Sequence, residues 1–159
     1  MTERWSDNVK NGICGVEFDR KDIQMNKLQV TTLESRFRIY DMRTQHPQEG
    51  HAYLLTKNPQ TTIWAAKHVP QNRDLVMTCG GDGTAYLYKY HYPAERFTTD
   101  SSTGHRRGVA GSVELLNNRK LSDQPIGAFD WSSDKQGLFV CASFDQMIRV
   151  GVVTKLAKH

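Results

Sequence analysis

Alternating apolar and polar residues predict short β-strands along most of the chain. In the segment Ile13-Cys14-Gly15-Val16-Glu17-Phe18 alternate positions are apolar, and a short strand is also expected around Arg4 to Val9. A period of two residues is typical of a strand with one buried face. Further strands are predicted at 27–32, 36–42, 51–55, 62–69, 75–79, 85–88, 112–116, 126–131, 137–143 and 146–153. Since no segment has a helical period, the pattern predicts an all-β fold.

Three of the predicted strands each begin just after an acidic residue in a turn. Glu34, Asp82 and Asp145 occupy these turns, at spacings of 82 − 34 = 48 and 145 − 82 = 63 residues. An independent landmark, the residue that ends an earlier strand in each unit, has spacings of 68 − 18 = 50 and 131 − 68 = 63 residues. The agreement indicates a repeated unit with one insertion in the second interval.

The repeats are predicted at about residues 3–42, 51–90 and 112–153 of a single domain, residues 1–159, with a long loop at 91–111. Four strands per unit at this spacing favour blades of a WD-repeat β-propeller. The Trp-Asp pair typical of such repeats is absent from its expected positions. We expect Glu34, Asp82 and Asp145 to be structural turn residues that accept hydrogen bonds from backbone amides.

Three blades are too few to close a propeller, since closed propellers typically have about 4 to 8 blades. The register places the Arg4 to Val9 strand on the outside of a blade whose other strands are missing, and leaves the last blade without an outer strand. An arc of three would therefore expose two apolar blade faces. We interpret the chain as the C-terminal part of a larger propeller.

The net charge of +4 raises the alternative of a nucleic-acid or chromatin-associated binding module. Such binding depends on clustered basic residues rather than on totals. The loops expected on one propeller face are residues 19–26, 41–50, 69–74, 91–111 and 132–136. These loops carry equal numbers of basic and acidic residues, so they predict no basic face.

The sequence predicts no enzyme, cofactor or metal site. Cys14, Cys79 and Cys141 are widely spaced within apolar strands, and the histidines have no zinc-ligand spacing. The Gly80-Gly81-Asp82-Gly83 segment has no P-loop motif around it and is predicted to be a hairpin turn. No catalytic residue is assigned.

The long polar loops are the expected place for function on such a scaffold. Arginine there can hold a partner carboxylate in a bidentate hydrogen bond. The alternative for the longest loop, 91–111, is a solvated insertion without a partner. The candidate partner contacts are Arg43, His46, Arg96, Arg106 and Arg107.

Several strings resemble a known family over nearly the whole chain. They include Asn11-Gly12-Ile13-Cys14, Tyr40-Asp41-Met42-Arg43, Val109-Ala110-Gly111-Ser112-Val113 and Ser143-Phe144-Asp145-Gln146. They are similar to the C-terminal portion of the Monad family of WD-repeat proteins, which are axonemal dynein assembly factors.

The resemblance implies a part of a seven-bladed propeller and a non-enzymatic adaptor role. Its expected partners are subunits of the RuvB-like and prefoldin-like co-chaperone machinery, with dynein chains as clients in the cytoplasm. Neither nucleic acid nor membrane is an expected partner.

Overall fold

The chain folds almost entirely into antiparallel β-structure. The computed structural model describes residues 5–7, 9, 11–19, 26–57 and 61–158. A 3-10 helix, η1 (Leu156–Lys158), follows the last strand. The strands are β1 (Ile13–Phe18), β2 (Lys27–Thr32), β3 (Arg36–His46), β4 (Gly50–Lys57), β5 (Ile63–Val69), β6 (Asn72–Gly80), β7 (Thr84–His91), β8 (Phe97–Thr99), β9 (Arg106–Gly108), β10 (Ser112–Lys120), β11 (Ile126–Trp131), β12 (Leu138–Ser143) and β13 (Ile148–Val152).

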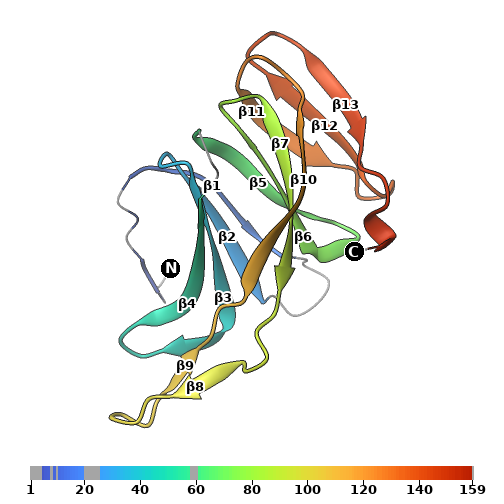
Figure 1. Ribbon diagram of the computed structural model, residues 1–159. Helices are drawn as coiled ribbons and strands as arrows, with labels where there is room; N and C mark the ends of the chain where they lie inside the picture. Colours follow the sequence, from blue (N-terminus) through green and yellow to red (C-terminus); the bar gives the residue numbers. More distant parts are fainter. Residues whose placement is uncertain (1–4, 8, 10, 20–25, 58–60, 159) are drawn as a thin grey trace.

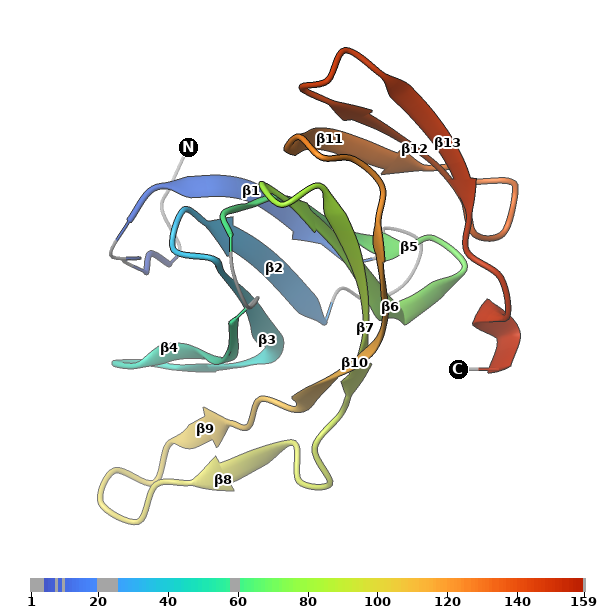
Figure 2. The same cartoon turned by 45° about the horizontal axis from the view of Figure 1, so that its top comes forward.

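The large strands form three sheets that lie side by side in an arc (Figures 1 and 2). Sheet 1 has the order β1-β2-β3-β4, sheet 2 the order β5-β6-β7-β10, and sheet 3 the order β11-β12-β13. Strands β1, β5 and β11 are neighbours across the sheets. Each sheet is a meander of the kind found in propeller blades, so the predicted all-β, partial-propeller fold is confirmed.

The sheets are offset by one strand from the repeats expected from the sequence. Strand β4 completes sheet 1 and β10 completes sheet 2, although each begins a predicted repeat. Sheet 3 has three strands within the described residues and lacks an outer strand, as the register predicts. The predicted strand at Arg4 to Val9 falls partly outside the described residues, and residues 5–7 and 9, which are described, are not in a strand.

Two separate apolar clusters join the sheets, because alternate residues of each strand point between them. Phe37 and Ile39 of β3 are fully buried against Ile63, Val76 and Tyr88 of sheet 2. The second cluster, between sheets 2 and 3, contains Val69, Leu75, Met77, Cys79, Ile126, Phe129, Trp131, Phe139 and Cys141. Sheet 2 is thus the shared layer of both cores.

The three turns that follow the second strand of each sheet have one geometry in common. The residue after Glu34, Asp82 or Asp145 has a left-handed backbone, with φ of 60° at Ser35, 73° at Gly83 and 68° at Gln146. A β-carbon on Gly83 would also come within 2.0 Å of the Ser122 carbonyl oxygen. The shared backbone geometry supports the register in which the sequence placed these turns.

The acidic turn residues make different hydrogen bonds. The Asp82 carboxylate accepts from the Thr84 amide at 3.0 Å and the Tyr86 hydroxyl at 2.6 Å. The Asp145 carboxylate accepts from the Met147 amide at 3.0 Å, the Ser122 hydroxyl at 2.8 Å and the guanidinium of Arg149. At Glu34 it is the backbone amide that donates, to the Thr32 hydroxyl at 3.4 Å.

Candidate functional site

The sequence-predicted contact residues gather on two hairpins that extend beyond sheets 1 and 2. One is the far end of the β3–β4 hairpin, residues 42–52, and the other is the β8–β9 hairpin, residues 96–108, between β7 and β10. We call these two segments the paired hairpins. Figure 2 shows both projecting from the same side of the arc. Within the long loop predicted at 91–111, strands β8 and β9 form this hairpin, and β9 contacts β3 and β4.

The contact between the paired hairpins is close because Gly108 lies in it. Gly108 is buried, and a β-carbon there would stand 3.3 Å from the Thr44 carbonyl oxygen and 3.4 Å from the Ala52 side chain. At the outer end, the Arg107 guanidinium pairs with the Glu49 carboxylate at 2.7 Å. These contacts hold β9 beside β3 and β4.

Arg43 is partly buried, and its side chain is turned toward internal partners. Its Nε donates to both carboxylate oxygens of Asp41, at 2.8 and 2.9 Å, and its guanidinium lies 4.9 Å from the Tyr92 ring centroid. The Asp41 side chain is 2% exposed, and the ion pair raises the pKa of Arg43. Asp41 thus neutralises the charge of Arg43. The Arg43 side chain also packs on Tyr92, near the start of the segment that leads into β8.

His46 is a buried turn residue of the β3–β4 hairpin. Its Nδ1 lies 3.3 Å from the Gln48 amide nitrogen and 3.2 Å from that of Glu49, and both amides donate to it. Because Nδ1 accepts, the neutral ring carries its proton on Nε2. The ring also packs edge-on against His105, with centroids 5.9 Å apart, which ties the two hairpins together.

Three candidate residues are exposed on the β8–β9 hairpin. They are Arg96, Arg106 and Arg107. The Arg96 guanidinium donates to the Arg43 carbonyl at 3.3 Å, and the Arg106 guanidinium stacks 4.3 Å from the Phe97 ring centroid. Stacking and backbone contacts restrain arginine side chains while leaving donors free for a partner.

The tip of the β8–β9 hairpin is shaped by Asp100. Its carboxylate accepts from the Ser102 hydroxyl at 2.6 Å and the Ser102 amide at 2.8 Å. These hydrogen bonds lower the pKa of Asp100, so the tip carries a negative charge at neutral pH. The chain turns back at Gly104, whose φ is +69°.

A buried charged cluster behind the paired hairpins was missed by the sequence reasoning. Lys27 of β2 is fully buried, and its Nζ donates to the Tyr92 hydroxyl at 2.7 Å and to Asp74 Oδ1 at 3.3 Å. Asp19 Oδ2 lies 3.6 Å away and also pairs with Arg73 at 2.5 Å. The cluster joins sheet 1 to sheet 2 beside Tyr92, where the β8–β9 hairpin begins.

No local sequence signal marks Lys27, because a lysine that begins a strand is usually solvated. Only the tertiary arrangement brings Asp19, Asp74 and Tyr92 to it, from positions 8, 47 and 65 residues away in sequence (27 − 19, 74 − 27 and 92 − 27). A buried charge without its partner would destabilise the fold. The cluster therefore favours the relative position of sheets 1 and 2 in which all its charges are paired.

The charged side chains around the paired hairpins are mostly held by partners within the structure. Among the described residues, no three His, Cys, Asp or Glu side chains are grouped as metal ligands, and the three cysteines are free. Arg43 and Arg107 of the paired hairpins, and Arg73 of the cluster behind them, are in ion pairs with carboxylates, which does not favour a phosphate-binding stripe. The one helix of the described chain, η1, is too short to cross a membrane.

Comparison with curated proteins finds close relatives over the whole chain. The chain is 56% identical to human dynein axonemal assembly factor 10 over 158 residues, which is 99% of this chain and 44% of that protein. It is 55% identical to the Chlamydomonas reinhardtii protein of the same name over 156 residues, which is 98% of this chain and 43% of that protein. The chain thus spans less than half the length of these relatives.

The fold also matches a solved structure. Sqt1 from Chaetomium thermophilum superposes with a TM-score of 0.62 at 19% sequence identity, covering 96% of this chain and 33% of that one. No family model matches the chain. The chain has the fold of partial WD-repeat propeller blades and resembles, from end to end, a portion of dynein axonemal assembly factor 10.

Proposed function

We propose that the chain is a non-enzymatic scaffold for cytoplasmic preassembly of axonemal dynein arms. The observation that supports this role is the identity of 54–57% to dynein axonemal assembly factor 10 in four animals and one alga, over essentially the entire chain. Its partners in this proposal are subunits of the RuvB-like and prefoldin-like co-chaperone machinery, with dynein chains as clients.

The paired hairpins are the proposed contact surface. They place three exposed arginines on a hairpin that is fixed by Gly108, by the Arg107–Glu49 pair and by the buried cluster at Lys27. A rigid support lowers the entropy lost when a partner binds. Arginine held in this way suits a carboxylate-bearing segment of another protein.

Binding of the purified chain to a reconstituted RuvB-like and prefoldin-like co-chaperone complex tests the proposal. The double charge reversal Arg96→Glu/Arg106→Glu, which leaves the Arg107–Glu49 pair intact, should weaken binding about tenfold or more, which is the effect of losing about 1.4 kcal/mol. A matched control is Arg119→Glu/Lys120→Glu, which reverses two adjacent exposed charges on β10.

The variants test the contact surface, and the unsubstituted chain tests the scaffold role. Equal affinity for both variants would exclude the paired hairpins as the contact surface. Failure of the unsubstituted chain to bind the complex, or to bind dynein chains presented by it, would contradict the scaffold role itself.

A further inference from the structure

The first strand of each sheet carries a β-bulge at the same place. Where β1 pairs with β2, β5 with β6 and β11 with β12, one residue near the start of the first strand has no partner in the register. These residues are Cys14, Trp64 and Gly127. Their spacings, 64 − 14 = 50 and 127 − 64 = 63, equal those of the strand landmark in the sequence. A bulge redirects the side chain of the extra residue away from the regular ladder.

The turn after the second strand of each sheet lies beside this bulge. In each sheet the first residue of the turn donates its amide to the carbonyl two residues before the bulge, at 2.9–3.0 Å. The pairs are Leu33 with Gly12, Gly81 with Thr62, and Phe144 with Pro125. The bulge position and the turn position of each sheet are therefore close neighbours.

Each sheet places one bulky apolar side chain at this pair of positions and a small residue at the other. Sheet 2 has Trp64 at the bulge and glycine at the turn, whereas sheet 3 has glycine at the bulge and Phe144 at the turn. A β-carbon on Gly127 would stand 3.0 Å from the Phe144 ring, so the small residue makes room for the large one. In sheet 1 the bulky residue is Leu33, and Cys14 is at the bulge.

The three bulky side chains are exposed on one side of the arc. The exposed fraction is 47% for Leu33, 36% for Trp64 and 65% for Phe144. We call these three residues, with the turns beside them, the turn face. Figure 1 shows the β2–β3, β6–β7 and β12–β13 turns on the side opposite the paired hairpins. Leu33 lies where sheets 1 and 2 meet, because the Thr62 hydroxyl donates to its carbonyl at 3.3 Å.

The turn face also carries acidic side chains without a basic partner. The residue that follows the turn position is Glu34, Asp82 or Asp145. Arg149 neutralises Asp145, but no ion pair joins Glu34 or Asp82 to a cation among the described residues. The charge of this face is therefore opposite to that of the exposed arginines on the paired hairpins.

We propose that the turn face binds an extended segment of a partner protein in which apolar side chains flank a lysine or arginine. The apolar side chains of the segment cover Leu33 and Phe144, and its cation lies on the Trp64 ring. Tryptophan is the best aromatic partner for a cation and is enriched among the residues that contribute most to binding. The inference goes beyond the proposed function and does not depend on it.

The charge of the face selects this occupant over an acidic one. A carboxylate-bearing segment, which suits the arginines of the paired hairpins, would be repelled by Glu34 and Asp82. A cation placed on Trp64 is instead attracted by the ring and by both carboxylates. The two sides of the arc therefore suit two different partners.

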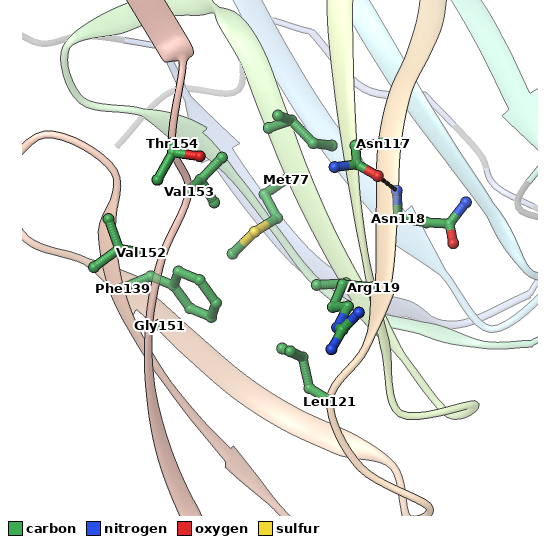
Figure 3. A pocket seen from close by; sticks show the side chains of 12 residues that line it. Met77, Asn117, Asn118, Arg119, Leu121, Phe139, Gly151, Val152, Val153 and Thr154 are labelled. Atoms are coloured by element: carbon green, nitrogen blue, oxygen red, sulfur yellow. Dashed lines mark hydrogen bonds between the residues drawn. The ribbon is translucent and has the colours of Figure 1, made fainter.

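A second apolar recess, between sheets 2 and 3, does not belong to the turn face. Met77, Leu121 and Phe139 contribute to its lining (Figure 3). Met77 and Phe139 are part of the core between these sheets, and the recess lies beside β13, on the edge where the other two sheets have a fourth strand. We therefore assign the recess to packing between blades and not to a partner.

Two libraries of short peptides test the proposal on the unsubstituted chain. They differ only at the central residue, flanked by leucine, isoleucine or phenylalanine, which is arginine in one library and glutamate in the other. Arginine-centred binders should lose about tenfold or more of their affinity in Trp64→Ala, whereas any glutamate-centred binder should keep its affinity. Absence of arginine-centred binders, or an unchanged affinity in Trp64→Ala, would overturn the proposal.

Glu34→Gln tests the charge of the face while leaving Trp64 in place. The substitution should weaken an arginine-centred peptide by about two- to fivefold, the usual effect of an exposed ion pair. It should not weaken a synthetic copy of that peptide with glutamine at the centre. Equal loss for the two copies would contradict the assigned role of the carboxylate. Phe144→Ala should weaken both copies alike, because it removes an apolar contact.

Two controls separate the turn face from other surfaces. Leu115→Ala removes a 45% exposed apolar side chain on β10, and Arg96→Glu/Arg106→Glu alters the paired hairpins. Neither should change the affinity of the arginine-centred peptides, and thermal melts check that every variant is folded. A loss in the double variant equal to that in Trp64→Ala would place the peptides on the paired hairpins and overturn the proposal. Since the co-chaperone experiment uses a different probe, either proposal can fail without the other.

Discussion

At the scale of single residues, Asp145 shows how much position in a repeat can reveal. Its register with Asp82 predicts an acceptor of turn hydrogen bonds, and its carboxylate does accept from the Met147 amide at 3.0 Å. The sequence does not reveal that Arg149 and Ser122 converge on the same carboxylate. That convergence depends on the path of the β10–β11 connection, which local pattern cannot predict.

Asp145→Asn should lower the melting temperature at neutral pH and reduce its pH dependence. The guanidinium of Arg149 and then the Ser143 hydroxyl hold the pKa of Asp145 well below its usual value of 3.8. A lowered folded-state pKa stabilises the fold above about pH 4, and this stabilisation is lost as the pH falls toward the folded-state pKa. Thermal melts between neutral and acid pH measure it. If the melting temperature of the variant fell at acid pH as much as that of the unsubstituted chain, Asp145 would not be the source of this pH dependence.

Three tyrosines should make the fold lose stability at alkaline pH. Burial raises the pKa of Tyr40, Tyr86 and Tyr88 to about 12, and Asp7 and Asp82 add to the effect at Tyr40 and Tyr86. A raised folded-state pKa means that stability is full below about pH 10, the unfolded value, and falls as the pH rises through about 12. Tyrosinate absorbance should therefore rise together with the loss of β-structure.

Tyr88→Phe provides the control for this alkaline transition. Tyr88 lies in the core between sheets 1 and 2, and phenylalanine keeps its ring without the ionisable hydroxyl. The variant should need a higher pH to unfold. A transition at the same pH would show that this hydroxyl does not contribute.

At the scale of strands and hairpins, periodic segments were predictable and polar ones were not. The predicted boundaries of β1, β2 and β11 agree with the structure because alternate residues are apolar. Strand β3 continues to His46, four residues beyond its predicted end at Met42. Residues 43–46 are polar on both faces, and their pairing depends on the hairpin turn and on β9 rather than on an apolar stripe.

The β8–β9 hairpin could not be predicted either, because its short strands carry no apolar stripe. Its strands are three residues each, and the contact that orders it is the approach of Gly108 to Thr44. Of the candidate contacts chosen for their charge, Arg43 and His46 have internal partners, while Arg96, Arg106 and Arg107 are exposed. Sequence reasoning placed these residues in loops but could not tell which of them, such as Arg43, His46 and Arg107, are held by partners within the structure.

Gly108→Val should detach the β8–β9 hairpin while leaving the sheets folded. A β-carbon at Gly108 would stand 3.3 Å from the Thr44 carbonyl oxygen, and the valine methyl groups would reach further into that contact. Hydrogen exchange of the Arg106 and Arg107 amides should become at least about tenfold faster, equivalent to about 1.4 kcal/mol of lost protection. The melting temperature of the sheets should change little.

Gly104→Asn is the matched control for this substitution. Gly104 has a left-handed φ of +69° that asparagine tolerates, and no atom lies within 4 Å of a β-carbon there. Exchange in β9 should remain slow in this variant. Equal acceleration in both variants would indicate a general loosening of the hairpin instead of a lost contact with Thr44.

At the scale of the whole molecule, sheet 2 connects the two separate cores that the described residues form. Phe37 contributes to the core between sheets 1 and 2, and Phe139 to that between sheets 2 and 3. Arrays of stacked repeats are stabilised by such nearest-neighbour contacts. The repeat in the sequence predicted that the sheets stack on one another. The division into two cores could not be predicted, because it depends on which faces of the three sheets meet.

Phe37→Ala and Phe139→Ala should therefore each weaken one interface by about 3–5 kcal/mol, the usual cost of removing a buried phenylalanine. Because neither residue contacts the other core, Phe37→Ala should speed hydrogen exchange in β2 and β3 more than in β12, and Phe139→Ala the reverse. Leu55→Ala, at a 45% exposed position on β4, is the surface control and should change stability by about 0.5 kcal/mol or less. If both core substitutions accelerated exchange equally in all three sheets, the arc would unfold as one cooperative unit, and its two cores would not be energetically separate.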